Sequence, residues 1–240
     1  MRNLKDCFFL IVTLFSLINL QAQEHNNSWM RATLSIPVKE RFKIDAEVQH
    51  RRQNGFENNN LFDQNLTFSF KNWIHYQHNP NVKFSVSPFA YYSNYPIINF
   101  KSDEHANPKS EVRFSAALEM NHELLKKLHV VGRTALEYRI YEKQKQSILR
   151  FRNRLGLQYE FNQQWKAVAT MEVLVNLAGV AATHFLDHNR FSGNVEYHPT
   201  QNIKLELGYL YISRLTNINI GIVGENTLFL NITYQLKTKN

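Results

Sequence analysis

The chain has 240 residues and a formal net charge of +8, from 28 Lys and Arg against 20 Asp and Glu. Hydrophobic residues make up 43% and aromatic residues 13%, which excludes collagen-like, low-complexity and largely disordered chains. A single cysteine excludes a disulfide-rich scaffold. The mean hydropathy of −0.42 is typical of a soluble protein, but an average hides any regular alternation of apolar and polar residues.

The N-terminal segment has the pattern of a secretory signal peptide. A basic start with Arg2 and Lys5 precedes an apolar run from Cys7 to Leu20, and Ala22 is a small residue suited to cleavage. The run is shorter than the ~20 residues of a membrane-spanning helix, so an uncleaved anchor is the weaker interpretation. We expect residues 1–22 to be a signal peptide that is removed on export, and residues 23–240 to form one domain without cysteine.

The rest of the chain is a succession of segments in which apolar and polar residues alternate. In the segment 42–51, Phe42, Ile44 and Val48 fall on one side and charged residues fall on the other. A strand separates these two sets, whereas a helix would mix them. The same alternation recurs, in chain order, in residues 29–36 (weakly), 42–51, 65–71, 82–87, 111–120, 130–140, 149–161, 165–173, 190–197, 203–211 and 227–236.

The lengths of these segments and of their connections favour a membrane barrel. Roughly eleven strands of about ten residues are expected, long enough to cross a bilayer when tilted, whereas globular strands average ~5–6 residues. Short connections such as 37–41 and 77–81 alternate with longer polar ones such as 53–60. The predicted fold is all-β: an antiparallel transmembrane β-barrel of about 10–12 strands, with short periplasmic turns and longer extracellular loops.

The strand count leaves one question. Bacterial barrels normally have an even number of strands and both termini in the periplasm, so we favour ten or twelve strands. A strand could be hidden in residues 93–110 or 216–223. Otherwise the first segment would lie inside the barrel.

Aromatic residues near the short connections predict an interfacial girdle, as membrane barrels have where the wall meets the lipid headgroups. The expected girdle consists of Trp73, Tyr76, Tyr159, Phe161, Trp165 and Tyr197. The alternative fold is a soluble periplasmic β-sandwich or lipocalin-like barrel, in which these residues would belong to the core. That fold explains the alternation but not the strand length or the unequal connections.

In a membrane barrel the apolar face meets lipid and the polar face fills the lumen. The predicted lumen charge network consists of Arg113, Glu119, Arg133, Glu137, Arg139, Arg150, Arg152, Arg154, Glu172, Arg190 and Glu196. One interpretation is a packed salt-bridge interior, because buried charges must be paired. The other is a narrow polar pore, or a pocket for a small anionic ligand, built on the alternating arginines 150, 152 and 154.

The sequence assigns no catalytic residue, cofactor or metal. His184, Asp187 and His188 share one predicted loop and could ligate a metal, but three polar residues in a loop are usually only solvated. We expect a non-enzymatic barrel. The alternative is a membrane-embedded hydrolase or lipid-modifying enzyme, which needs a cluster of Ser and His or of carboxylates.

The expected partners follow from the predicted location in a Gram-negative outer membrane. They are outer-membrane lipid and lipopolysaccharide, the barrel-assembly machinery during biogenesis, and a small anionic ligand. Nucleic acid is not expected, because the basic residues are dispersed beside acidic ones and form no patch.

Short motifs spread over the chain carry a family resemblance. They are the Trp29 strand after Gln21-Ala22-Gln23, Arg51-Arg52, Arg150-Phe151-Arg152-Asn153-Arg154-Leu155, Glu172, Leu186-Asp187-His188-Asn189-Arg190-Phe191 and Leu207-Gly208-Tyr209-Leu210. On these residues the chain resembles the uncharacterised bacterial outer-membrane barrel family known as domain of unknown function 2490, frequent in Bacteroidetes. The resemblance implies an outer-membrane barrel and carries over no catalytic residue.

Overall fold

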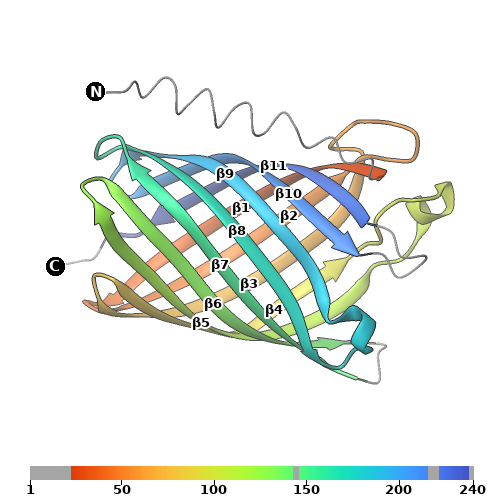
Figure 1. The fold of residues 1–240 in the computed structure, drawn as a ribbon, viewed down its shortest axis with the longest axis horizontal. Helices are drawn as coiled ribbons and strands as arrows, with labels where there is room; N and C mark the ends of the chain where they lie inside the picture. Colours follow the sequence, from red (N-terminus) through yellow and green to blue (C-terminus); the bar gives the residue numbers. More distant parts are fainter. Residues whose placement is uncertain (1–22, 143–145, 216–221, 238–240) are drawn as a thin grey trace.

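A computed structural model of the protein describes residues 23–142, 146–215 and 222–237. These residues form one closed barrel with two short 3₁₀ helices at one end (Figure 1). The elements are β1 (Gln23–Lys39), β2 (Phe42–Gln53), β3 (Gln64–Asn79), β4 (Val82–Asn94), η1 (Lys101–His105), β5 (Lys109–Leu125), β6 (Leu128–Tyr141), β7 (Ile148–Glu160), β8 (Trp165–Ala178), η2 (Ala182–His184), β9 (Leu186–Thr200), β10 (Ile203–Leu215) and β11 (Ile222–Gln235). None of the helices in the described ranges is long and apolar enough to span a membrane.

The barrel closes through a parallel pair of strands. Each strand pairs antiparallel with its neighbours in the chain, but β1 and β11 run in the same direction, from Gln23 beside Val223 to Ser35 beside Gln235. Every strand therefore has two partners, and no edge is left exposed. The described residues form eleven strands, so our preference for an even count is wrong. The first segment does not lie inside the barrel either, because β1 supplies the final seam of the wall.

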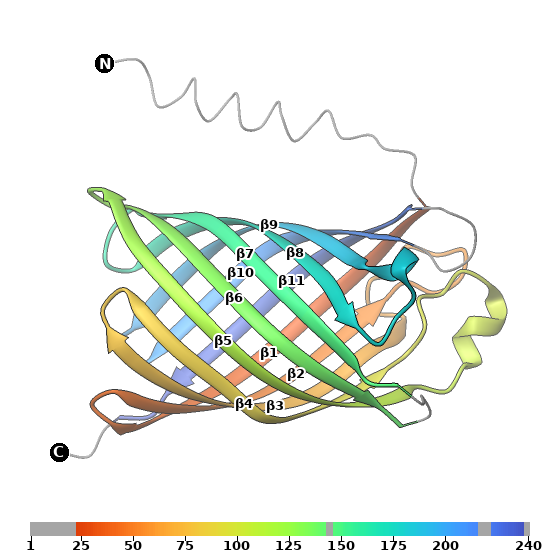
Figure 2. The ribbon, with the colours of Figure 1, turned by 60° about the horizontal axis from the view of Figure 1, so that its bottom comes forward.

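The strands are longer than the sequence suggests, from 12 residues in β2 to 17 in β1, and they tilt against the barrel axis (Figure 2). Residues 40–41, 80–81, 126–127, 161–164 and 201–202 connect strands at one end, called here the short-turn end. Residues 54–63, 95–108 and 179–185 connect them at the other, long-loop end. The connection 95–108 contains η1 and no strand, while most of 216–223 lies outside the described residues.

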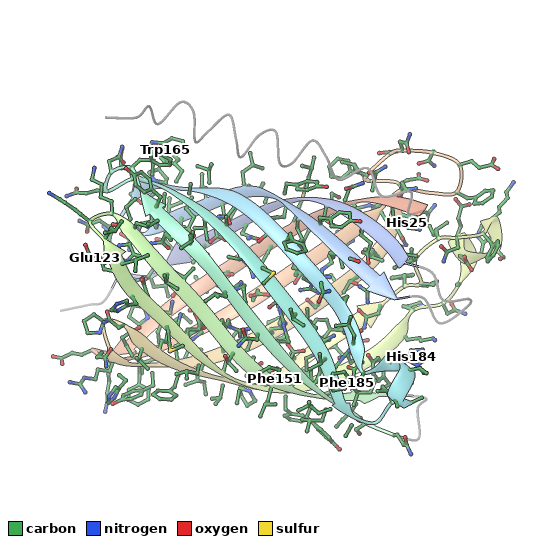
Figure 3. All side chains as sticks on the ribbon, in the orientation of Figure 1. His25, Glu123, Phe151, Trp165, His184 and Phe185 are labelled. Atoms are coloured by element: carbon green, nitrogen blue, oxygen red, sulfur yellow. The ribbon has the colours of Figure 1, made fainter. Side chains whose placement is uncertain are left out.

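The barrel is apolar outside and polar inside. Leu155 and Leu157 of β7 are 55% and 50% exposed on the outer face, whereas Ser69, Glu111 and Glu137 are buried inside. Apolar side chains therefore predominate on the outer face, and Figure 3 shows side chains projecting from the wall around the barrel. A soluble sandwich or lipocalin-like barrel buries its apolar side chains, and this arrangement is the reverse.

Five of the six aromatic residues expected in a girdle lie on the outer face at the short-turn end, where Figure 3 labels Trp165: Tyr76, Tyr159, Phe161, Trp165 and Tyr197. Tyr197 stacks on Trp165 with ring centroids 4.3 Å apart. The expectation for Trp73 is corrected, because Trp73 faces the lumen beside His75. The alternation along β3 requires this, since Trp73 shares its parity with Lys71 and His75 and not with the outward Ile74.

The parallel seam predicts a specific cross-link. Met30 and Leu230 are register partners across β1 and β11, and the chain from Gln23 onward has no native cysteine. The double variant M30C/L230C should form a disulfide under mild oxidation, because neighbouring strands hold such partners within bridging distance. The control M30C/L207C places the second cysteine one strand further away, on β10. Cross-linking of the control and not of the first pair would contradict the seam.

Candidate functional site in the barrel lumen

One cavity of about 1230 Å³ extends along the lumen. Its lining reaches from Asn81 and Asn202 in short turns to Ile97 and Asn107 in a long loop. This volume exceeds the ~300–1,000 Å³ of ordinary ligand pockets. All eleven residues of the predicted charge network line the cavity: Arg113, Glu119, Arg133, Glu137, Arg139, Arg150, Arg152, Arg154, Glu172, Arg190 and Glu196.

Buried carboxylates and arginines form a continuous layer on the wall made by β5 to β9. At its centre Glu137, 3% exposed, accepts hydrogen bonds from Arg150 Nη2 at 2.6 Å and from Arg152 Nη1 at 2.7 Å. Arg113 Nη1 lies 3.5 Å from the same carboxylate. Charge-assisted bonds of this kind are the strongest hydrogen bonds in proteins, and here they tie three strands together.

Two further carboxylates extend this arginine–carboxylate layer in both directions. Glu111 accepts from Arg139 Nε at 2.7 Å and from Arg113 Nη2 at 2.7 Å. Glu172 accepts from Arg152 Nη2 at 2.8 Å through one oxygen and from Arg190 Nη1 at 3.2 Å through the other. The layer consists of Glu111, Arg113, Glu137, Arg139, Arg150, Arg152, Glu172, Asp187 and Arg190.

Strand register explains why the layer forms. Glu137 of β6 stands beside Arg150 of β7, and Glu172 of β8 stands beside Arg190 of β9. Directly opposed side chains on one face lie ~4.5–5.5 Å apart at Cβ, so opposite charges in these positions meet without distortion. The alternation that directs apolar residues outward therefore also brings these charges together.

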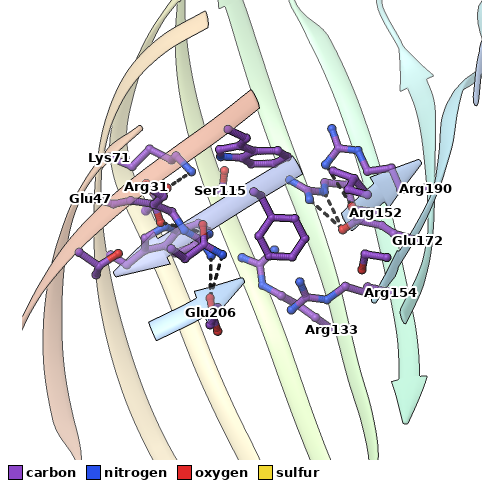
Figure 4. Close-up of a pocket in the computed structure, with 18 of the residues that line it drawn as sticks. Arg31, Glu47, Lys71, Ser115, Arg133, Arg152, Arg154, Glu172, Arg190 and Glu206 are labelled. Carbon is purple, nitrogen blue, oxygen red and sulfur yellow. Dashed lines mark hydrogen bonds and ion pairs between the residues drawn. The ribbon is translucent and has the colours of Figure 1, made fainter. Parts of the chain in front are cut away.

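A second chain of ion pairs lies across the lumen from the arginine–carboxylate layer (Figure 4). Arg31 lies 3.7 Å from Glu47 and 3.5 Å from Glu206. Lys71 pairs with Glu47, and Lys204 pairs with Glu206 at 2.6 Å. This group is absent from the predicted charge network, although each member falls on the polar side of its strand and the alternation alone identifies it.

The three alternating arginines of β7 have different environments. Arg150 and Arg152 belong to the arginine–carboxylate layer. Arg154 is exposed to the lumen, and it makes no hydrogen bond or ion pair with the residues that the structure describes. Its register partner on β6 is another cation, Arg133 (Figure 4). The motif therefore combines two structural arginines with one that is available to a solute.

The lumen also contains an aromatic contact that the sequence did not predict. The guanidinium of Arg51 lies 3.5 Å from the ring centroid of Trp29, and that of Arg190 lies 6.0 Å from it. These residues come from β2, β1 and β9, so the contact joins the arginine–carboxylate layer to the strands around the seam. Cation–π contacts hold guanidinium groups in place without neutralising them.

The remaining predicted residues pair with other residues of the barrel wall. Glu119 pairs with Lys83 at 3.0 Å, and Glu196 lies 3.7 Å from His198. Asp187 and His188 begin β9 instead of lying in a loop, and Asp187 accepts from Arg150 at 2.6 Å. No group of three metal-ligating side chains occurs within the described ranges.

One hydrogen-bond chain has the composition of a catalytic triad. His75 lies 2.8 Å from Ser85 Oγ through Nδ1 and 3.1 Å from Asp45 through Nε2. Ser85 is only 2% exposed, and its hydroxyl is also 3.3 Å from Glu119. A nucleophile must present its oxygen to the substrate, whereas this hydroxyl is buried in the wall, so the contacts favour a role in packing.

The sequence matches, over residues 26–220, the family described as "Protein of unknown function (DUF2490)". The chain belongs to this family. No curated protein matches the chain. The similarity extends over most of the barrel and agrees with the resemblance carried by the short motifs.

Solved structures similar to this DUF2490 protein include two porins and an outer membrane protein. The NanC porin in a rhombohedral crystal form is 9% identical with a TM-score of 0.51, covering 88% of this chain and 99% of that chain. An anion-selective porin from Comamonas acidovorans is 8% identical with a TM-score of 0.37, over 81% of this chain and 53% of that one. OmpT from Vibrio cholerae is 8% identical with a TM-score of 0.37, over 80% and 83%. At these identities the likeness to NanC supports the fold alone.

The arginine–carboxylate layer predicts a large effect of removing its central charge. Glu137→Gln should lower the free energy of unfolding by about 3–5 kcal/mol, because three arginines would lose a buried counter-charge. The control is Glu196→Gln. Among the described residues, the Glu196 carboxylate forms an ion pair only with His198. Its removal should change the free energy of unfolding by less than about 1 kcal/mol. Urea titration of both variants in detergent micelles measures the difference. Equal effects would show that the layer does not stabilise the barrel.

Proposed function

We propose that this protein is an outer-membrane barrel that conducts small anions through a narrow polar lumen. The observation that supports this proposal is an excess of positive charge along a cavity that reaches both ends of the barrel. Among the residues that line the cavity, fifteen are Lys or Arg and nine are Asp or Glu. Fixed positive charge in a channel with low-dielectric walls raises the local concentration of anions and lowers that of cations.

The outer face supports the membrane location. A closed wall covered with apolar side chains and ending in aromatic residues is stable in a bilayer and unstable in water. We infer that residues 1–22 are cleaved on export, that the short turns face the periplasm and that the long loops face outward. Lipopolysaccharide would then surround the loop half of the barrel, and the barrel-assembly machinery would insert it.

A second candidate function is a structural barrel that conducts nothing. The long connection 95–108 favours it, because Pro96, Ile97 and Asn107 of this segment line the cavity at the long-loop end. Gln53 donates a hydrogen bond to the carbonyl of Pro96 at 2.9 Å, and Ile98 is 5% exposed. The arginine–carboxylate layer narrows the same half of the barrel. Measurement of ionic current across a bilayer distinguishes the conducting channel from the structural barrel.

Reconstitution of the chain from Gln23 onward in a planar bilayer tests the proposal. Under a KCl gradient we expect single channels whose reversal potential shows preference for chloride over potassium. Arg154→Glu should reduce that preference, because it reverses an exposed lumen charge. Lys126→Glu, in a short turn and outside the cavity lining, should leave it unchanged. Silence in the bilayer would support the structural barrel, and preference for potassium would refute the anion pathway.

A further inference from the structure

The lumen arginines divide into those with counter-charges and those without, and this division points to a ligand. We propose that Arg133 and Arg154 form a binding site for the oxyanion group of a small solute, a carboxylate or a phosphate. The inference deepens the proposed function by naming the class of solute that the lumen retains. Binding itself can be measured whether or not the barrel carries current.

Arg154 makes no hydrogen bond or ion pair with any carboxylate of the described residues. The nearest acidic residue in register is Glu172 on β8, directly beside it. Both oxygens of Glu172 already accept hydrogen bonds, one from Arg152 at 2.8 Å and the other from Arg190 at 3.2 Å. Glu172 and Glu119 are near enough to attract the guanidinium of Arg154, but neither bonds to it, so its N–H donors are exposed to the lumen and unused among the described residues.

Arg133 is only partly neutralised. Its Nε lies 3.5 Å from Glu119, but Glu119 also pairs with Lys83 at 3.0 Å and lies 3.3 Å from the hydroxyl of Ser85. One carboxylate is therefore shared by two cations. The guanidinium carbon of Arg133 lies 5.0 Å from the ring centroid of Trp73, a contact that orients the group and leaves its charge in place.

The two arginines are direct register partners on β6 and β7 (Figure 4). Each arginine has a carboxylate as its register partner on the other side, Glu119 beside Arg133 and Glu172 beside Arg154. Like charges in opposed positions on one face of a sheet repel each other, and an anion bound between the two arginines would relieve that repulsion. Each guanidinium presents parallel N–H donors that match two oxygens of a carboxylate or phosphate. A single bound oxyanion can therefore accept hydrogen bonds from both arginines. A chloride ion has no second acceptor atom to match the paired donors.

The surroundings of the pair are suited to a solute. Both arginines line the main cavity, and so do Thr170, two residues before Glu172 on the same face of β8, and Gln158, four residues beyond Arg154 on β7. Ser115, labelled in Figure 4, lines the same cavity. These neutral groups offer hydrogen bonds to the rest of a bound molecule without competing for the arginines.

Isothermal titration calorimetry on the chain from Gln23 onward, folded in detergent micelles, tests the site with inorganic phosphate and, separately, with acetate. We expect R154Q and R133Q each to weaken binding of the bound anion at least tenfold. R154K should also weaken it, because lysine keeps the charge but loses the paired donors. The matched control K109Q removes one lumen charge at the long-loop end, outside the site, and should change binding less than twofold.

The outcomes separate this inference from the proposed function. Binding of phosphate alone, of acetate alone or of both, lost in R154Q and R133Q, supports the site and identifies the oxyanion. Binding that R154Q leaves unchanged, or that K109Q weakens as much, overturns the site in favour of a diffuse charge effect. Absence of binding by either anion overturns it too. Site-specific binding without bilayer current would refute conduction and support the site. Bilayer current without binding would support conduction and refute the site.

Discussion

The structure depends on the pairing of buried carboxylates with arginines inside a barrel whose outer wall is apolar. Once alternate side chains of each strand are directed outward to form that wall, the others must fill the lumen. Charges placed there are stable only when they are paired and hydrogen-bonded. Glu137 meets this requirement with bonds from Arg150 and Arg152, and Glu111 and Glu172 repeat it on both sides.

The same requirement determines what the lumen can do. Arginines outnumber the carboxylates near them. When every carboxylate has formed its ion pairs, some guanidinium groups still have unused N–H donors. Arg150 and Arg152 are held by acids, whereas Arg154, two residues further along the same strand face, is not. One part of the charge network thus pairs within the wall, and another part is the site that we propose for an anion. The two interpretations of the network describe different residues and are compatible.

The period-two pattern was sufficient to predict the wall, because the parity of a residue in a strand determines its face. The eleven residues of the predicted network have the inward parity, and they line the cavity. Trp73 differs from the other predicted girdle residues because its parity in β3 directs it inward, whatever its aromatic character. The parallel seam between β1 and β11 and the pairing of Asp187 with Arg150 depend on the register of distant strands, which no local pattern encodes.

Accessibility of single cysteines along β7 tests the central claim most directly. The claim is that one strand face meets lipid and the other meets water next to unpaired positive charge. In liposomes, a membrane-impermeant anionic thiol reagent should modify R154C and Q158C rapidly and leave L155C and L157C unmodified. Equal modification of the two sets, or protection of positions 154 and 158, would contradict the account.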